Sequence, residues 1–573
     1  MHTPANDPRL QARHAVKRDP GNAMAWIMLS DVELEAGDAR TGAAAAQRAL
    51  QLAPGHPEAL ARLGRGQWML GHLAAAADSL RAAARQAPQH AGIAVWLAHV
   101  LEDTGEAEAA SESYARAHTL LPEHPQIAGY LLAWRRRLCD WTDLDHLSRQ
   151  VRDALRAGQG AMEPFAFLSE DSSPAEQLAC ARLRAHEVAA RVTPLPPAPP
   201  RSGGPLRLGF LSNGFGSHPT GLLTVAFLEA LAARGGSNIH LFALNGDDGS
   251  AIRQRLAAIS RMHDVSAQPH AGVAAQIRQA GIDVLFDLRG WGGGGRPEVL
   301  AMRPAPVQVN WLAYPGTSGA PWIDYVLADP VVLPDELAAH FSETVVRLPR
   351  CFQPSDTRRE IPPPPPRDAC GLPEEATVLC CFNNSYKINP ASFARFMQIL
   401  RGVPDSVLWL LSGPGQADAR LRRAADKAGV DPSRLVFMAK QPQAHYLARL
   451  QLADLFLDCN PYNAHTTASD ALWAGCPVLT RPGATFASRV AASLNHHVGM
   501  DHMNMADDDA FIARAIELGN DRGQLASVRA ELEARRSSTG LFDMDGFATD
   551  FLAAATRMHQ RLPTPPRTGS LGS

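Results

Sequence analysis

The N-terminal third of the chain repeats with a fixed period, and this period restricts the fold more than any other feature of the sequence. Steps of 34 residues separate the prolines at 20, 54, 88 and 122, the glycines at 37, 71 and 105, and the leucines at 29, 63 and 97. The alanine-rich segments between them have helical periodicity. One pair of helices cannot bury its own apolar face, so units of this length stack on their neighbours. The period therefore predicts an array of helical hairpins.

A helix–turn–helix unit of this length, with small residues at the crossing and proline at the end, resembles the tetratricopeptide repeat. Three units are clear between residues 20 and 121, and we expect partial units on both sides. We assign residues 1–155 to the repeats. The resemblance implies a concave surface that binds proteins or peptides and performs no catalysis itself.

The pattern changes after a proline- and glycine-rich linker at 191–205. We interpret residues 156–204 as a helical connector with this linker. Beyond it, short apolar runs alternate with helical segments in two blocks, which predicts two parallel, doubly wound sheets. The expected strands are 206–212, 240–246, 283–290, 307–316 and 324–332, then 377–383, 406–413, 434–440, 455–460 and 477–483.

The predicted fold class is therefore an α-solenoid followed by two Rossmann-like halves. We place the halves at 205–360 and 368–540, separated by the proline run 361–367. Facing sheets leave a cleft lined by the carboxyl ends of their strands, where nucleotides and sugar nucleotides usually bind. Residues 541–573 are expected to form a C-terminal helix and a disordered tail.

Composition excludes several classes of function. The formal net charge is −3, which gives no basis for nucleic-acid binding. No apolar run approaches ~18 residues and no signal peptide is evident, so we expect no membrane partner. The eight cysteines are scattered without a CxxC pair, which favours free thiols in a reducing compartment. We expect a cytoplasmic protein.

The stretch Pro461–Gly475 follows an apolar strand and contains the start of a helix at Thr466 and Thr467. Threonine is a good N-cap, and free N–H groups at a helix start can bind an anion such as phosphate. A capped helix without a ligand explains the same pattern. Asp470, one turn further, can accept hydrogen bonds from ribose hydroxyls, or can simply complement the helix dipole.

Lysine is rare in this chain: only four of the 55 basic residues are lysines. A lysine that remains is evidence for a site that needs a compact ammonium. Lys387 lies in the loop after the first strand of the second block, where it can neutralise a diphosphate leaving group. Lys440 follows the third strand and can reach the nucleotide, as can His445 and Arg449.

In the first block, His218 lies in the loop after the first strand. An imidazole there can act as a general base or donate a hydrogen bond to phosphate, although a lone histidine is often a surface residue. Tyr314 lies in a segment with several turn signals, which we place beside the cleft edge. Alone, that segment indicates only a structured loop.

Motifs for metals and common cofactors are missing. No Asp-x-Asp pair follows a sheet strand, and the pair Asp543 and Asp545 lies at the start of the tail, where we interpret it as a helix start or a solvated pair. No GxxxxGK[ST] or GxGxxG motif is present. We expect neither a metal nor a cofactor.

Taken together, these segments resemble the O-linked N-acetylglucosamine transferase family, and specifically its bacterial members. The resemblance is carried by GSHPT (216–220), RPAPVQ (303–308), YPGTSG (314–319), FNNSYKI (382–388), SVLWLL (406–411), HTTASDALWAG (465–475) and ASRVAAS (487–493). It implies a glycosyltransferase B fold and a UDP-N-acetylglucosamine donor. It also implies metal-independent transfer, with inversion, to serine or threonine hydroxyls of proteins.

The resemblance also implies roles for single residues. His218, within the motif that includes Pro219 and Thr220, is similar to the family histidine at the reacting centre. Lys387 is similar to the lysine on the diphosphate, and Asn384 stands where the family has a glutamine that contacts the nucleotide. The implied pyrophosphate and uridine turn is His465, Thr466 and Thr467, with Asp470 on the ribose. The choice between Lys440 and Gln443 for a further lysine, and between His445 and Tyr446 at the uracil, stays open.

Three other functions fit the same sequence. A related family with this architecture uses GDP-fucose to modify proteins. A scaffold could recruit partners through its repeats while its catalytic half only binds nucleotide. A small molecule or glycan could replace the protein acceptor.

Overall fold

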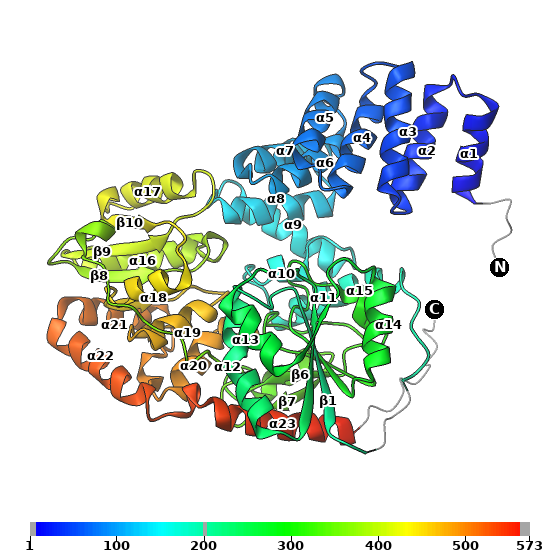
Figure 1. Cartoon of the computed structure of the whole chain (residues 1–573). Helices are drawn as coiled ribbons and strands as arrows, with labels where there is room; N and C mark the ends of the chain where they lie inside the picture. Colours follow the sequence, from blue (N-terminus) through cyan, green and yellow to red (C-terminus); the bar gives the residue numbers. More distant parts are fainter. Residues whose placement is uncertain (1–6, 199–202, 562–573) are drawn as a thin grey trace. The chain divides into compact units, whose positions relative to one another are not determined.

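The computed structural model describes residues 7–198 and 203–561, and the chain divides into two compact units (Figure 1). One unit is Met1–Val151 with Gly413–Asp418, and the other is Arg152–Ser412 with Ala419–Ser573. Part of the predicted linker, 199–202, and the predicted disordered tail after residue 561 lie outside the described residues.

The first unit consists of helical hairpins, as the 34-residue period predicts. Its helices are α1 (Pro8–Arg18), α2 (Ala23–Glu35), α3 (Ala39–Leu52), α4 (Pro57–Met69), α5 (Leu73–Gln86), α6 (Ala91–Asp103), α7 (Ala107–Leu120), α8 (Pro125–Arg137) and the start of α9 (Leu144–Arg156). Gly37, Gly71 and Gly105 have φ angles of 82°, 79° and 78° between paired helices, a conformation that favours glycine. A Cβ on Gly42 would lie 2.6 Å from Cγ of Leu34, so close packing of α2 on α3 requires the small residue.

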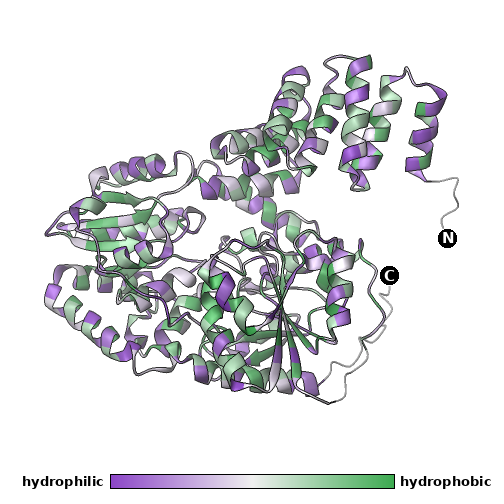
Figure 2. Cartoon of the chain, viewed as in Figure 1, coloured by the Kyte–Doolittle hydropathy of each residue, from purple (hydrophilic) through white to green (hydrophobic). Residues whose placement is uncertain are grey.

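The second unit contains two parallel sheets, which confirms the predicted fold class. The first has the order β3-β2-β1-β4-β5-β6-β7 and the second β10-β9-β8-β11-β12. The strands are β1 (Leu206–Ser212), β2 (Ser237–Ala243), β3 (Arg261–Asp264), β4 (Val284–Asp287), β5 (Val307–Asn310), β6 (Tyr325–Ala328), β7 (Thr344–Arg347), β8 (Thr377–Cys381), β9 (Ser406–Leu411), β10 (Leu435–Met438), β11 (Leu455–Leu457) and β12 (Val478–Leu479). The buried strands β8 and β9 are coloured as hydrophobic in Figure 2.

Two strands of the first sheet, β3 and β7, were not among the expected ones. Both are short strands at the sheet edges, and neither contains a fully buried residue. A strand with one open edge does not need the continuous apolar run that identifies a central parallel strand.

Helices surround both sheets. Those around the first sheet are α12 (Pro219–Arg234), α13 (Ala251–Ile259), α14 (His270–Ala280) and α15 (Pro297–Ala301). Those of the second half are α16 (Pro390–Gly402), α17 (Ala417–Lys427), α18 (Gln443–Leu450), α19 (Thr466–Trp473), α20 (Val490–His497), α21 (Asp508–Asn520) and α22 (Arg522–Arg536). None of the helices within the described ranges combines the length and the apolar character that crossing a bilayer requires.

The segment interpreted from sequence as a connector belongs to the core of the first half. It forms α10 (Pro164–Phe167) and α11 (Pro174–Ala189), and Ser173 with Glu176 makes a capping box at the start of α11. Ala185 and Val188 lie in one buried cluster with residues of the first sheet and its helices. The connector is therefore a packed layer that supports the first half.

The last helix, α23 (Met544–Gln560), also packs on the first half (Figure 1). The ring centroid of Phe551 lies 4.7 Å from Phe286, 4.7 Å from Phe227 and 4.8 Å from Trp311. Asp543 is the N-cap and accepts a hydrogen bond from the backbone N–H of Gly546 at 2.9 Å, which agrees with the helix-start interpretation. None of the eight cysteines, all within the described residues, forms a disulfide, and all except Cys370 are buried.

Replacing Phe551 with alanine is expected to destabilise the second unit by about 3–5 kcal/mol, because the change leaves a cavity among aromatic rings. The measurement is the midpoint of urea unfolding followed by tryptophan fluorescence. Gln560→Ala, at an exposed position of the same helix, is the matched control. Equal midpoints for the two variants would show that α23 is not part of this core.

Candidate active site

A buried carboxylate organises the turn that follows β11. Asp458, only 1% exposed, accepts hydrogen bonds at Oδ1 from the backbone N–H groups of Cys459 and Ala464, both at 2.7 Å. Its Oδ2 accepts from Oγ1 of Thr480 at 2.6 Å. Burial raises the pKa of Asp458 to about 6 despite these hydrogen bonds. The carboxylate thus ties the turn between β11 and α19 to the end of β12.

Lys387 lies at the end of a short 3-10 helix, Ser385–Lys387, and its side chain is held against this turn. Its Nζ donates a hydrogen bond to the carbonyl of Asn463 at 2.6 Å and lies 3.7 Å from the ring centroid of Tyr462. The residue is 7% exposed, and burial lowers the pKa of Lys387 to about 8, although Asp458 opposes the shift. Within the described residues Nζ makes this one hydrogen bond, so two of its three N–H groups are left for a ligand.

The start of α19 differs from the prediction in one respect: the N-cap is His465 and not a threonine. The hydroxyl of Thr467 donates to Oδ1 of Asn383 at 2.9 Å, so it does not cap the helix. Within the described residues the backbone N–H groups of Thr466 and Thr467 have no hydrogen-bond acceptor. The expected anion site is therefore open even though the expected cap is wrong.

His465 is neutral and has a defined tautomer. Its Nε2 lies 3.0 Å from the carbonyl oxygen of Ala487, and a carbonyl can only accept, so Nε2 carries the proton. Burial, followed by the charge of Lys387, holds the pKa of His465 well below its ordinary value. The imidazole therefore adds no positive charge at the start of α19.

Asp470 lies buried on α19 and is paired with an arginine from outside the second sheet. Its Oδ1 accepts from Nη1 of Arg359. Arg359 belongs to residues 348–366, which follow the last strand of the first sheet and lead to the second half; they are called here the inter-half segment. Burial raises the pKa of Asp470, and Arg359 opposes this shift. Sequence reasoning identified the carboxylate but not its partner.

His218 is the N-cap of α12 and contacts its own helix. Its Nδ1 accepts a hydrogen bond from the backbone N–H of Thr220 at 3.2 Å. Burial, and then the charges of Arg289 and Lys440, lower the pKa of His218 to about 4. The neutral ring therefore carries its proton on Nε2, and this nitrogen can donate to a ligand. Pro219 begins the helix at an exposed position, whereas Thr220 is buried.

Arg289 is a candidate functional residue that sequence reasoning missed. It follows β4, its backbone N–H donates to Oδ1 of Asp287 at 2.9 Å, and its Nη2 donates to the carbonyl of Gly293. Its charge acts on both His218 and Tyr462, so it lies near both halves of the site. The available signal was an arginine two residues beyond the end of a buried strand.

The other predicted site residues are less closely associated with Lys387, Asp470 and His218. Tyr314 is 4% exposed and buried in the core instead of lying open at the cleft edge. Asn384, Lys440 and His445 are exposed, and only Lys440 acts on a site residue, through its effect on the pKa of His218.

The two uracil candidates on α18 differ in their burial. The ring of Tyr446 lies 5.8 Å from that of Phe382 and its hydroxyl is buried, whereas His445 is exposed. Arg449 donates a hydrogen bond to the carbonyl of His445 at 3.1 Å. Burial raises the pKa of Cys370, and the charge of Arg449 opposes this rise.

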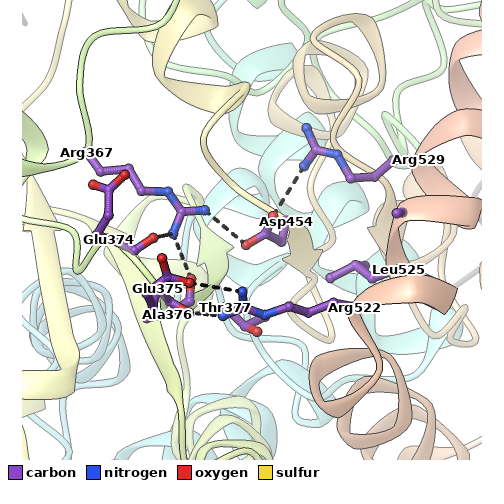
Figure 3. Close-up of a pocket in the computed structure, with 10 residues that line it drawn as sticks. Arg367, Glu374, Glu375, Ala376, Thr377, Asp454, Arg522, Leu525 and Arg529 are labelled. Carbon is purple, nitrogen blue, oxygen red and sulfur yellow. Dashed lines mark hydrogen bonds and ion pairs between the residues drawn. The ribbon is translucent and has the colours of Figure 1, made fainter.

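A cavity of about 310 Å³ lies elsewhere in the second half (Figure 3). Thr377 begins β8 and Asp454 precedes β11, so this cavity is at the amino ends of the strands, opposite the edge that carries Lys387. Its arginines form ion pairs, with Arg367 3.6 Å and Arg529 3.8 Å from Asp454. The cavity contains no candidate site residue. No group of three or more possible metal ligands lies together in the described parts of the chain.

The chain is similar to known glycosyltransferases. Residues 192–363 and 365–551 match the model of the family described as Glycosyl transferase family 41. The chain is 33% identical over 430 residues to the probable UDP-N-acetylglucosamine–peptide N-acetylglucosaminyltransferase SEC of Arabidopsis thaliana, covering 71% of this chain and 44% of that protein. It is 29% identical over 553 residues to the UDP-N-acetylglucosamine–peptide N-acetylglucosaminyltransferase of Caenorhabditis elegans, covering 74% of this chain and 48% of that one.

Among solved structures, a mutant of Thermobaculum terrenum O-GlcNAc transferase is similar over 98% of this chain and 99% of its own, with a TM-score of 0.70 and 28% identity. The chain spans about half the length of these two curated relatives but nearly the whole of the bacterial structure.

Proposed function

Because the chain belongs to glycosyl transferase family 41, we propose that it transfers N-acetylglucosamine from UDP-N-acetylglucosamine to serine or threonine hydroxyls of proteins. The observation that carries the proposal is the buried ammonium of Lys387 beside the open first turn of α19. Together they form a dehydrated, positively polarised site of the kind that a diphosphate requires. The activities for which the relatives are named supply the sugar and the peptide acceptor.

The donor lies across the carboxyl edge of the second sheet. Its diphosphate accepts hydrogen bonds from Lys387 and from the backbone N–H groups of Thr466 and Thr467, and a ribose hydroxyl donates to Asp470. His465 lies beside the diphosphate with its Nδ1 free of the backbone contact that Nε2 makes. The buried positions of Lys387 and Asp470 support this arrangement, since both side chains are held in place before the donor arrives.

In the proposed reaction the acceptor oxygen attacks the anomeric carbon on the face opposite the diphosphate, which inverts the configuration. A new C–O bond forms as the bond to the β-phosphate oxygen breaks, and the hydroxyl proton passes to solvent. Negative charge grows on the β-phosphate, so Lys387 and the helix start stabilise the transition state more than the ground state. These groups take the part that a divalent cation has in metal-dependent transferases, which is why we propose that no metal is required.

His218 is proposed to position the reactants and not to remove the proton. Its Nδ1 is occupied by the N–H of Thr220, and its Nε2 carries a proton that can be donated to the donor sugar or phosphate. Arg289, on the same side, adds positive charge that favours an anion and disfavours protonation of the imidazole. Both effects suit a neutral hydrogen-bond donor at the reacting centre.

The repeat unit is proposed to recruit the protein acceptor. On adjacent repeats, the guanidinium groups of Arg62 and Arg65 lie 5.3 Å and 5.5 Å from the ring centroid of Trp96. All three side chains are partly exposed. A mixed aromatic and cationic surface of this kind can bind an extended peptide.

Titration calorimetry with UDP, UDP-N-acetylglucosamine and GDP-fucose tests the donor. We expect the two uridine compounds to bind in the presence of EDTA and GDP-fucose not to bind. Radiolabelled UDP-N-acetylglucosamine incubated with cell lysate should then label proteins, also in EDTA. Binding of GDP-fucose alone would assign the chain to fucosyl transfer, and nucleotide binding without transfer would indicate a scaffold. Label found only in small molecules or glycans would show that the acceptor is one of these and not a protein.

A further inference from the structure

A continuous series of polar contacts joins the first half to the nucleotide-binding helix α19. Arg255 on α13 donates to Asp356 of the inter-half segment, with Nη1 2.8 Å from Oδ2 and Nη2 3.2 Å from Oδ1. The backbone carbonyl of Asp356 accepts from Nε of Arg359 at 2.8 Å. Nη1 of Arg359 then donates to Oδ1 of Asp470. Three consecutive contacts therefore connect α13 with α19.

Both members of the ion pair at the end of this series, Arg359 and Asp470, are buried. The side chains of Arg359 and Asp470 are 4% and 7% exposed. Nη2 of Arg359 donates to Oγ of Ser355 at 2.8 Å, and the guanidinium lies 5.8 Å from the ring centroid of Trp473. With each of its nitrogens bonded, the guanidinium has one orientation. A buried ion pair with this many contacts fixes geometry more than it adds stability.

We propose that Arg359 is a positioning residue for the donor: it keeps the Asp470 carboxylate ionised and oriented so that this carboxylate accepts a hydrogen bond from a ribose hydroxyl of the uridine diphosphate. This inference rests on the proposed use of a UDP-sugar. The carboxylate that binds the ribose is then also bonded to the inter-half segment. Donor binding and the relative position of the halves are coupled through Arg359.

The other groups that face Asp470 do not replace Arg359. The phenol of Tyr446 on α18 is close enough for Asp470 to raise its pKa, and it is uncharged. Arg536 on α22 donates to the carbonyl of Trp473 and lies 5.6 Å from the ring centroid of Trp473. Among the described residues, Arg359 is the one cation paired with Asp470. Without it, burial alone would act on the carboxyl, which would take up a proton as the pH falls and become a weaker acceptor.

The test compares the affinities of UDP, 2′-deoxy-UDP and 3′-deoxy-UDP by calorimetry between about pH 6 and pH 9. The wild-type protein (the natural chain) should bind UDP about 10-fold more tightly than one of the deoxy compounds at every pH. This factor is the usual cost of losing a hydrogen bond to a charged group. Arg359→Met should lose this preference at the acid end and regain part of it at the alkaline end. Arg359→Lys retains the charge and should retain the preference at every pH.

Two further variants keep the test decisive. Arg358→Met changes the adjacent, 68% exposed arginine and should behave as the natural chain. If Arg359→Met does not fold, the double variant Arg359→Met, Asp470→Asn carries no unpaired charge and should bind UDP without ribose preference at any pH. A pH-independent preference in Arg359→Met, or none in the natural chain, would overturn the inference and leave the proposed function intact. Failure of the natural chain to bind UDP at all would instead overturn the proposed function.

Discussion

Replacing Lys387 with alanine is expected to lower the turnover number by about 100-fold or more while part of the UDP affinity remains. The ammonium has two N–H groups available and is dehydrated by Tyr462 and the turn after β11. It therefore acts most strongly on the charge that develops on the leaving diphosphate. The N-terminus of α19 stays in place in the variant, so binding should fall less than turnover. Steady-state rates and UDP calorimetry measure the two effects separately.

The same residue should determine the alkaline side of the pH profile. Since burial lowers the pKa of Lys387 to about 8, the free enzyme loses this charge as the pH rises through that value, and kcat/KM falls. A bound diphosphate favours the charged ammonium, so the alkaline limb of kcat should lie at higher pH. Lys427→Ala, at an exposed position in the last turn of α17, is the control and should leave both quantities unchanged. Near-normal turnover in Lys387→Ala would remove this lysine from the mechanism.

Replacing His218 with alanine is expected to lower kcat/KM by about 100-fold or more, because the reacting centre loses an oriented donor. The pKa of His218 is lowered to about 4, so the imidazole is neutral above that value and charged only below it. We therefore expect no acid limb near 6.5 in the natural chain. His218→Asn should keep the alkaline limb near pH 8, since that limb belongs to Lys387.

The pH profile also distinguishes the two roles of this histidine. An acid limb near neutrality that disappears in His218→Asn would identify a general base and would contradict the positioning role. His270→Ala, a half-exposed histidine at the start of α14, is the matched control and should leave the profile unchanged.

Features encoded by local periodicity were predictable from the sequence. The 34-residue step predicts the hairpins of the first unit because each repeat makes the same contacts with its neighbours. The buried runs that form β1, β8 and β9 predict two sheets, since central parallel strands are apolar on both faces. Edge strands β3 and β7 lack that pattern and were missed for the same reason.

The amino-acid sequence alone determined which residue types follow the strands. It therefore predicted that Lys387, Asp470 and His218 lie at the carboxyl edges of two facing sheets. Only the tertiary structure decided what those side chains contact. Arg359 and Asp470 are 111 residues apart, and Thr467 bonds to Asn383, 84 residues away, so His465 and not threonine caps α19. Contacts of this kind join segments that have no common period. They arise because buried polar groups must find partners wherever folding brings one within reach.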